Sequence, residues 1–131
     1  MIKLETRNLS YSYHAGQAVL NDISLEIYDG SVTVLLGLNG SGKTTLIKVL
    51  TGLLKPLKGT TFIEAKDITQ ISSTELSKLI SYVPQNISDD TDFAVLDYLT
   101  FGRMNTIKFY SSPKSEDYEK AKAVAEELGI T

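Results

Sequence analysis

The sequence predicts an α/β fold in two parts, a mixed β and α/β part over residues 1–85 and a helical part over residues 86–131. Three observations lead to this fold class. Apolar and polar side chains alternate around Ile2, Leu4 and Leu9 and again over residues 23–27, apolar runs later alternate with helix-forming segments, and strand patterns are absent after residue 85. The chain has 131 residues, of which 42% are hydrophobic and 22% charged, an ordinary globular balance.

The N-terminal residues predict an antiparallel β part. Residues 2–13 predict one or two strands, and residues 18–37 predict a hairpin. In that hairpin, residues 23–27 alternate as a strand with one solvated face, and Asp29-Gly30 is a favoured turn dipeptide. The run "VTVLLG" at 32–37 is almost wholly apolar, which is typical of a strand buried on both faces of a sheet.

The next segments predict strands joined by helices. Residues 43–53 predict a helix, 60–68 a further strand, and 72–80 a short helix with serines ahead of Glu75 as caps. The run "ISYVPQ" at 80–85 predicts a second buried strand. Strands that alternate with helices favour a partial parallel sheet with helical crossovers.

The residues after 85 predict helices. Residues 93–103 predict a short helix that ends near Gly102. The segment 111–130 predicts an amphipathic helix, with a cap at Ser112 or Ser115 and an end at Gly129. Its predicted apolar stripe consists of Tyr118, Ala121, Ala125 and Leu128. Because this helix ends close to residue 131, we expect the chain to be an incomplete unit.

Composition narrows the environment and partners. A formal net charge of −3 argues against nucleic acid as a partner. The sequence contains no cysteine, no signal peptide pattern and no apolar run of the ~20 residues that span a bilayer. We therefore expect a soluble chain in the cytoplasm.

Glycines cluster in the loop between the run at 32–36 and the predicted helix. Gly37, four residues, and then Gly42-Lys43-Thr44 fit the pattern G-x-x-x-x-G-K-[ST], the P-loop. Glycines let successive backbone N–H groups turn inward around phosphate oxygens, and the following helix directs its N-terminal amides at the same anion. A glycine turn that binds nothing is the alternative, but the apolar run before it and the helix after it favour phosphate binding.

The side chains of this loop predict a polyphosphate and Mg²⁺ as ligands. Lys43 is placed to bridge the β- and γ-phosphates, and the Thr44 hydroxyl to coordinate Mg²⁺. Thr45 offers a further hydroxyl, which we assign to the α-phosphate.

Three separately spaced segments carry a family resemblance: "VLNDISLEIYDG", "GLNGSGKTTLIKVLTGLLKPLKG" and "ISYVPQ". Together they closely resemble the N-terminal portion of the nucleotide-binding subunit of ATP-binding cassette (ABC) transporters. The resemblance implies a P-loop NTPase fold of ABC type, with an antiparallel β part, a partial α/β core and the start of a helical subdomain. The nucleotide-binding loop residues that it implies are Gly37, Asn39, Gly40, Ser41, Gly42, Lys43, Thr44 and Thr45.

The resemblance also implies roles for two residues outside the loop. Gln85 matches the glutamine that reaches Mg²⁺ and the attacking water, which makes Gln85 and Lys43 the implied catalytic residues. Tyr13 falls where the family places an aromatic ring against adenine, and Tyr11 is a competing candidate. His14 does not match the family's switch histidine.

Other family motifs are not found in the 131 residues. The sequence has no LSGGQ-like run and no apolar strand that ends in Asp-Glu. The resemblance therefore implies a truncated ABC ATPase that binds nucleotide by itself, whereas hydrolysis needs the intact protein.

The resemblance implies partners and a place in the cell. They are a second copy of the subunit and a membrane permease, which contacts the region after Gln85, roughly 86–103, and holds the subunit at the inner face of the membrane. The run "VLDYLTFGRMN" is most similar to importers of iron chelates, haem or cobalamin. One alternative is a small P-loop kinase, which needs a lid with arginines, yet Arg7 and Arg103 are the only arginines. The other is a non-transport ABC ATPase of DNA repair or translation.

Overall fold

The computed structural model describes residues 1–85, 92–104 and 111–130. They belong to two compact units, Met1–Tyr82 and Val83–Thr131, which are described separately. The functional division that we predicted at residue 85, between an ATP-binding core and a helical subdomain, stays a prediction.

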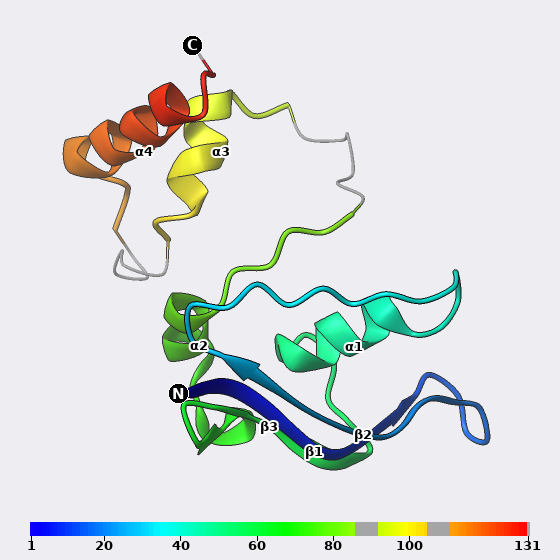
Figure 1. Ribbon diagram of the computed structural model, residues 1–131. Coiled ribbons are helices and arrows are strands. Elements are labelled where there is room, and N and C mark those ends of the chain that lie inside the picture. The colour runs from blue at the N-terminus through cyan, green and yellow to red at the C-terminus, as the bar shows by residue number, and fades with distance from the viewer. Residues whose placement is uncertain (86–91, 105–110, 131) are drawn as a thin grey trace. The chain divides into compact units, whose positions relative to one another are not determined.

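A four-stranded antiparallel sheet forms the base of the first unit (Figure 1). Its strands are β1 (Ile2–Ser12), β2 (Ala18–Tyr28), β3 (Lys58–Ile63) and β4 (Lys66–Asp67), in the order β2-β1-β3-β4. The antiparallel β part predicted at the N-terminus is therefore present. However, β2 pairs with β1 and not with the segment 32–37, so the predicted hairpin over 18–37 is wrong.

The strand predicted over 60–68 is a hairpin of β3 and β4. Glu64 and Ala65 form its turn, and both have positive φ angles, 50° and 64°. Positive φ at both central positions suits the twist of a two-residue hairpin loop. The sequence did not predict this turn because neither residue is Gly, Asn or Asp, the types usually found at these two positions.

Two predicted helices and a single 3-10 turn complete the first unit. They are α1 (Lys43–Leu50), η1 (Ile68–Gln70) and α2 (Ser73–Leu79). The serine cap predicted for the last helix is confirmed, because Ser72 Oγ accepts a hydrogen bond from the Glu75 backbone N–H at 3.3 Å.

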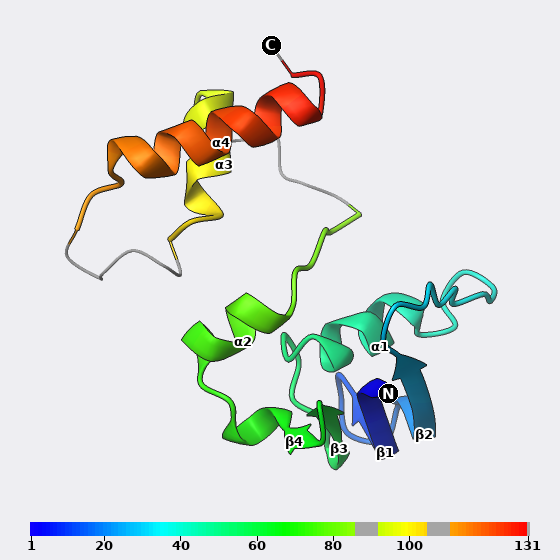
Figure 2. The same cartoon turned by 60° about the vertical axis from the view of Figure 1, so that its left-hand side comes forward.

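The main hydrophobic core lies between α1 and the β1–β2 pair (Figure 2). Leu46, Val49 and Leu50 of α1 bury their side chains against Leu9 of β1 and Leu20 of β2. At roughly 1.5–3 kcal/mol for each fully buried aliphatic side chain, this contact is strong enough to fix the helix on the sheet. The core therefore determines where the N-terminal end of α1 lies.

The two predicted buried strands, 32–37 and 80–85, do not form. Neither segment is paired, and Val32, Val34 and Leu36 are 93%, 70% and 85% exposed. A strand buried on both faces needs a hydrogen-bonded neighbour and covering helices. Within the described ranges, no other segment supplies these, so local apolar character alone does not make a strand.

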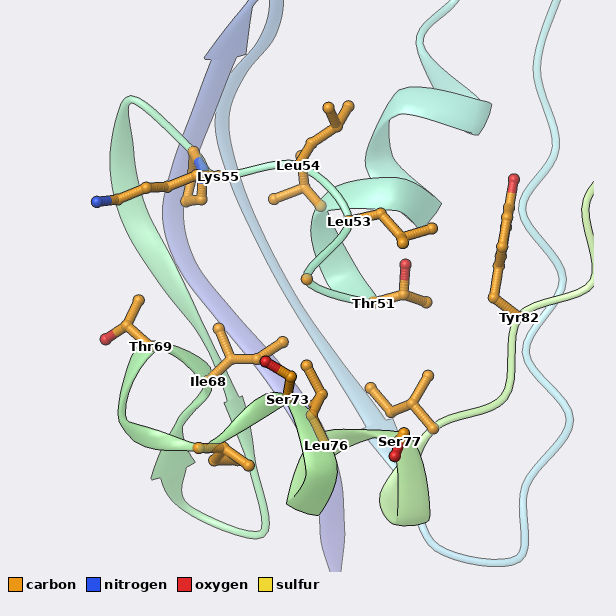
Figure 3. Close-up of a pocket in the computed structure, with 15 residues that line it drawn as sticks. Thr51, Leu53, Leu54, Lys55, Ile68, Thr69, Ser73, Leu76, Ser77 and Tyr82 are labelled. Atoms are coloured by element: carbon orange, nitrogen blue, oxygen red, sulfur yellow. The ribbon is translucent and has the colours of Figure 1, made fainter. Parts of the chain in front are cut away.

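An apolar groove of about 600 Å³ opens beside the C-terminal end of α1 (Figure 3). Figure 3 shows Ile68 and Leu76, from η1 and α2, pointing toward the loop that follows α1, while Tyr82 stands on another wall. None of the site residues predicted from the sequence lines this groove. It is therefore distinct from the glycine loop.

The second unit contains two packed helices, α3 (Val95–Phe101) and α4 (Ser115–Glu127). Asp117 ties the first turn of α4 to the turn that follows α3, since it accepts hydrogen bonds from the Lys114 backbone N–H at 3.1 Å and from Arg103 Nε at 3.2 Å. The Lys114 amide and the Arg103 guanidinium hold the pKa of Asp117 below its usual value. Lys114 is the N-cap, so the predicted serine cap is wrong.

The predicted stripe of the second helix is only partly buried. Ala121 is buried, and Tyr118 and Ala125 are half-buried, but Leu128 is 63% exposed. The predicted end at Gly129 is confirmed. Its φ is +69°, and its backbone N–H donates to the Glu126 carbonyl at 3.1 Å.

Candidate functional site

The glycine loop occupies residues 37–42 and leads directly into α1. Its tip is a turn in which the Ser41 backbone N–H donates to the Leu38 carbonyl at 3.2 Å, with Gly40 at φ +81°. Positive φ at this position is readily available to glycine. Asn39 and Ser41, also predicted as loop ligands, are both exposed at this tip.

Gly42 fixes the point at which the loop becomes a helix. Its φ is +90°, its carbonyl accepts the first helical hydrogen bond from the Leu46 N–H at 2.8 Å, and it is the N-cap of α1. A Cβ at this position would lie 3.1 Å from the Val19 carbonyl oxygen of β2 and 3.2 Å from a methyl carbon of Leu20. The missing side chain therefore lets the start of α1 approach the sheet.

The N-terminal end of α1 is suited to an anion. Its N-cap makes no side-chain hydrogen bond, and its first turn contains no acidic residue. The first amides of a helix lack intrahelical acceptors, and the helix dipole adds partial positive charge there. Backbone donors and favourable potential therefore meet at one place.

Lys43, the first residue of α1, turns its side chain back over the loop. Its Nζ donates to the carbonyls of Gly37 and Leu38, both at 2.8 Å. A Cβ on Gly37 would lie 2.7 Å from Ser41 Oγ, so this glycine keeps room inside the loop. The ammonium group is thus held at the centre of the curled backbone.

Tyr13 lies just beyond β1 and reaches α1. Its hydroxyl is 3.2 Å from Thr45 Oγ1, and its side chain is 53% exposed. The Tyr11 ring meets it edge-on, with 5.0 Å between ring centroids and 87° between ring planes. Tyr11 itself packs against the core cluster, so Tyr13 is the ring with an open surface beside the loop.

The structure brings together most of the predicted site residues, which are Tyr13 and the loop residues from Gly37 to Thr45. Thr44, the predicted Mg²⁺ ligand, is exposed in the first turn of α1. Gln85 is also exposed but belongs to the second unit, so its predicted role stays a prediction. Among residues 1–85, 92–104 and 111–130, no cluster of three His, Asp or Glu side chains could bind a metal ion.

Two features of the site were missed from the sequence. They are the close approach of Gly42 to the Val19 carbonyl and the hydrogen bond between Tyr13 and Thr45. In both, the two residues are more than twenty positions apart in the sequence. No local pattern predicts such contacts, although the G-K-T run that places Thr45 does predict that it lies on the helix.

Comparison with known proteins identifies the family. A family described as "ABC transporter" matches residues 20–131. The chain belongs to the ABC transporter family. The P-loop fold of ABC type that the sequence predicted is thereby confirmed, and the antiparallel N-terminal sheet agrees with it.

Relatives and solved ABC structures give the same result. The chain is 38% identical over 128 residues to the "Probable iron chelatin transport ATP-binding protein" of Helicobacter pylori. This alignment covers 97% of the chain and 50% of that protein. It is 37% identical over 132 residues to the "Manganese transport system ATP-binding protein MntB" of Bacillus subtilis, covering 99% of the chain and 50% of that protein. A nucleotide-free ATP-binding cassette from an ABC transporter superposes with a TM-score of 0.81 at 33% identity, covering 99% of the chain and 55% of that structure.

The chain therefore spans about half the length of the curated relatives that it matches. In the described parts of this ABC family member, no helix has both the length and the apolar character needed to cross a membrane.

Replacement of Gly42 tests the close approach of α1 to the sheet. We expect Gly42→Ala to lower the free energy of unfolding by about 1–3 kcal/mol, because alanine is strained at positive φ and its Cβ meets the backbone of Val19. Urea unfolding of both proteins measures this loss. Gly30→Ala is the matched control, since Gly30 has φ +68° with nothing within 4 Å of the added Cβ. Equal losses in the two variants would contradict a role for the contact with β2.

Proposed function

We propose that the chain is the P-loop portion of an ABC transporter ATPase subunit, which couples ATP binding and hydrolysis to solute import. The observation that carries this proposal is the curled loop 37–42, in which the Gly37 and Leu38 carbonyls hold the Lys43 ammonium and which ends at the start of α1, where no side chain caps the helix. Backbone donors, a helix N-terminus and a lysine in one place suit a polyphosphate.

Phosphate binding rests on donors that the structure already orients. Lys43 has three N–H donors, and two are used by the carbonyls of Gly37 and Leu38. The third donates to a phosphate oxygen between the β and γ positions. Since the loop carbonyls hold the ammonium, its side chain loses little freedom when the anion binds.

The Mg²⁺ ion that accompanies ATP fits the hydroxyl at the second position of α1. Thr44 is exposed there, next to the lysine, and an oxygen ligand suits Mg²⁺, which retains several waters and binds through substrate phosphates. When bound, the ion neutralises charge on the phosphates. Thr44 would hold the ion through its hydroxyl, and Gln85 is the residue that we propose would act as a second ligand and orient the attacking water.

Tyr13 is the proposed platform for adenine. Its half-exposed ring stands beside the start of α1, whereas the Tyr11 ring supports it from the core side. A flat ring binds a purine by stacking, for ~1–3 kcal/mol per base by analogy with nucleic acids.

The proposed partners are a second copy of the subunit and a permease at the inner face of the membrane. An aromatic patch, formed by Phe93 just before α3 and by Tyr98 and Phe101 on α3, is the proposed permease contact. These rings are 55%, 49% and 44% exposed, and Phe101 meets Phe93 edge-on at 5.0 Å between centroids. Residues 86–91 of the predicted contact region lie outside the described residues. Clustered exposed aromatics are typical of protein interfaces.

The proposed cargo is an iron chelate, haem or cobalamin. The name of the Helicobacter pylori relative supports an iron chelate, and that of the Bacillus subtilis relative supports a metal.

Lys43→Ala tests the phosphate site. We expect ATP binding to weaken ten- to a hundredfold, because a charge-assisted hydrogen bond to phosphate contributes about 1.5–3 kcal/mol. Calorimetric titration with Mg·ATP measures the affinity. Lys48→Ala, in the last turn of the same helix, is the control and should bind as the wild type does. Unchanged binding by the Lys43 variant would remove the proposed function.

Tyr13→Ala tests the adenine platform. We expect it to weaken ATP and GTP by similar factors, of about five- to a hundredfold, since stacking uses the face of a base and not its edge. Equilibrium dialysis with both nucleotides distinguishes this from base-specific recognition. A larger loss from Tyr11→Ala in folded protein would assign the platform to Tyr11.

Tyr98→Ala tests the permease contact in the intact protein. We expect at least a tenfold loss of affinity for a purified multi-span membrane subunit, as is typical of an aromatic interface residue. A pull-down titration of the detergent-solubilised subunit measures this loss. Lys122→Ala on α4, another exposed helical position, is the control. If both variants bind normally, α3 is not the contact.

A further inference from the structure

The hydrogen bond between Tyr13 and Thr45 joins the two halves of the site. Tyr13 follows β1, and Thr45 lies in the first turn of α1, where it is only 7% exposed. Their hydroxyl oxygens are 3.2 Å apart although 32 positions separate the residues, and either can be the donor. A surface tyrosine is thus tied to a buried hydroxyl of the phosphate loop.

We propose that Tyr13 is a positioning residue that orients the Thr45 hydroxyl toward the polyphosphate; this inference rests on the proposed nucleotide binding. A hydroxyl has one donor and two acceptor positions, so Thr45 can accept from Tyr13 and donate to a phosphate oxygen at once. The resulting chain runs from the Tyr13 O–H to Thr45 Oγ1, and from the Thr45 O–H to the phosphate. Both bonds strengthen because successive hydrogen bonds polarise one another.

Without Tyr13, the Thr45 hydroxyl has a competing acceptor. Threonine on a helix commonly donates to the carbonyl four residues earlier, here that of Ser41, in a rotamer that turns it from the ligand. An acceptor lone pair occupied by the Tyr13 O–H favours the rotamer seen in the structure. Tyr13 therefore prepares Thr45 for phosphate, beyond stacking on the base.

The ring of Tyr13 is held at two points, which makes it suitable for this role. Its hydroxyl meets Thr45, and its side meets the Tyr11 ring at 87°. Tyr11 packs on the core that also fixes α1, so the positions of Tyr13 and Thr45 both depend on that core. A ring that is 53% exposed is in this way kept in one orientation.

Inorganic tripolyphosphate with Mg²⁺ is the decisive probe, because it has no base to stack on Tyr13. We expect Tyr13→Phe, which keeps the ring and removes only the hydroxyl, to bind tripolyphosphate about three- to fivefold more weakly than the wild type, as expected for part of a neutral hydrogen bond. In a Thr45→Val background, Tyr13→Phe should have no further effect. Calorimetry on the wild type, the two single variants and the double variant gives this comparison.

Tyr28→Phe is the matched control. It also removes a hydroxyl that makes a hydrogen bond, here to Glu26. Tyr28 lies at the end of β2 and pairs with Ile2, which is at the opposite end of β1 from Ser12 and the adjacent Tyr13. Its tripolyphosphate affinity should equal that of the wild type. Equal unfolding midpoints of the Tyr13→Phe and wild-type proteins exclude a change in fold as the cause.

Two outcomes would overturn this inference. One is unchanged tripolyphosphate binding in Tyr13→Phe, and the other is an equal loss from Tyr13→Phe with and without Thr45. In either case the proposed function stands as long as Lys43→Ala weakens tripolyphosphate and ATP. If Lys43→Ala binds both normally, the proposed function itself fails.

Discussion

The packing of α1 on the β1–β2 pair is the contact on which the candidate site depends. Leu46, Val49 and Leu50 fix the helix axis against Leu9 and Leu20. That packing brings Gly42 so close to β2 that an added Cβ would lie 3.1 Å from the Val19 carbonyl oxygen, and it places Thr45 beside Tyr13. The phosphate loop has little buried apolar surface of its own, so the core under α1 determines where its donors point. Stability and binding geometry therefore have one source.

The sequence predicted well what depends on neighbours along the chain. The loop pattern, the helix that follows Lys43, the Ser72 cap and the Gly129 end all involve residues within about seven positions of one another. These features follow from backbone geometry and hydrogen bonds that a short segment forms by itself. The role of Tyr13, which rests on its family position, stays a prediction, and the structure adds that Tyr11 packs against the core.

What the sequence could not predict depends on distant partners. The runs at 32–37 and 80–85 have the composition of buried strands, but pairing depends on which segment lies alongside. The same holds for Val19 behind Gly42 and for the bond from Tyr13 to Thr45. The hairpin turn at Glu64 and Ala65 was not predicted for another reason, since its positive φ angles fall on residue types that rarely adopt them.

The segment 32–36 differs from α1 in one respect that matters for the loop between them. α1 anchors the loop at Gly42, whereas residues 32–36 pair with no strand of the described residues and expose apolar side chains. Any strand that pairs with this segment also immobilises Gly37, whose carbonyl holds the Lys43 ammonium. Completion of the sheet and ordering of the loop thus share an entropy loss, so whichever comes first makes the other more favourable. By thermodynamic reciprocity, an anion that binds in the loop 37–42 also stabilises strand pairing by residues 32–36, which it does not touch.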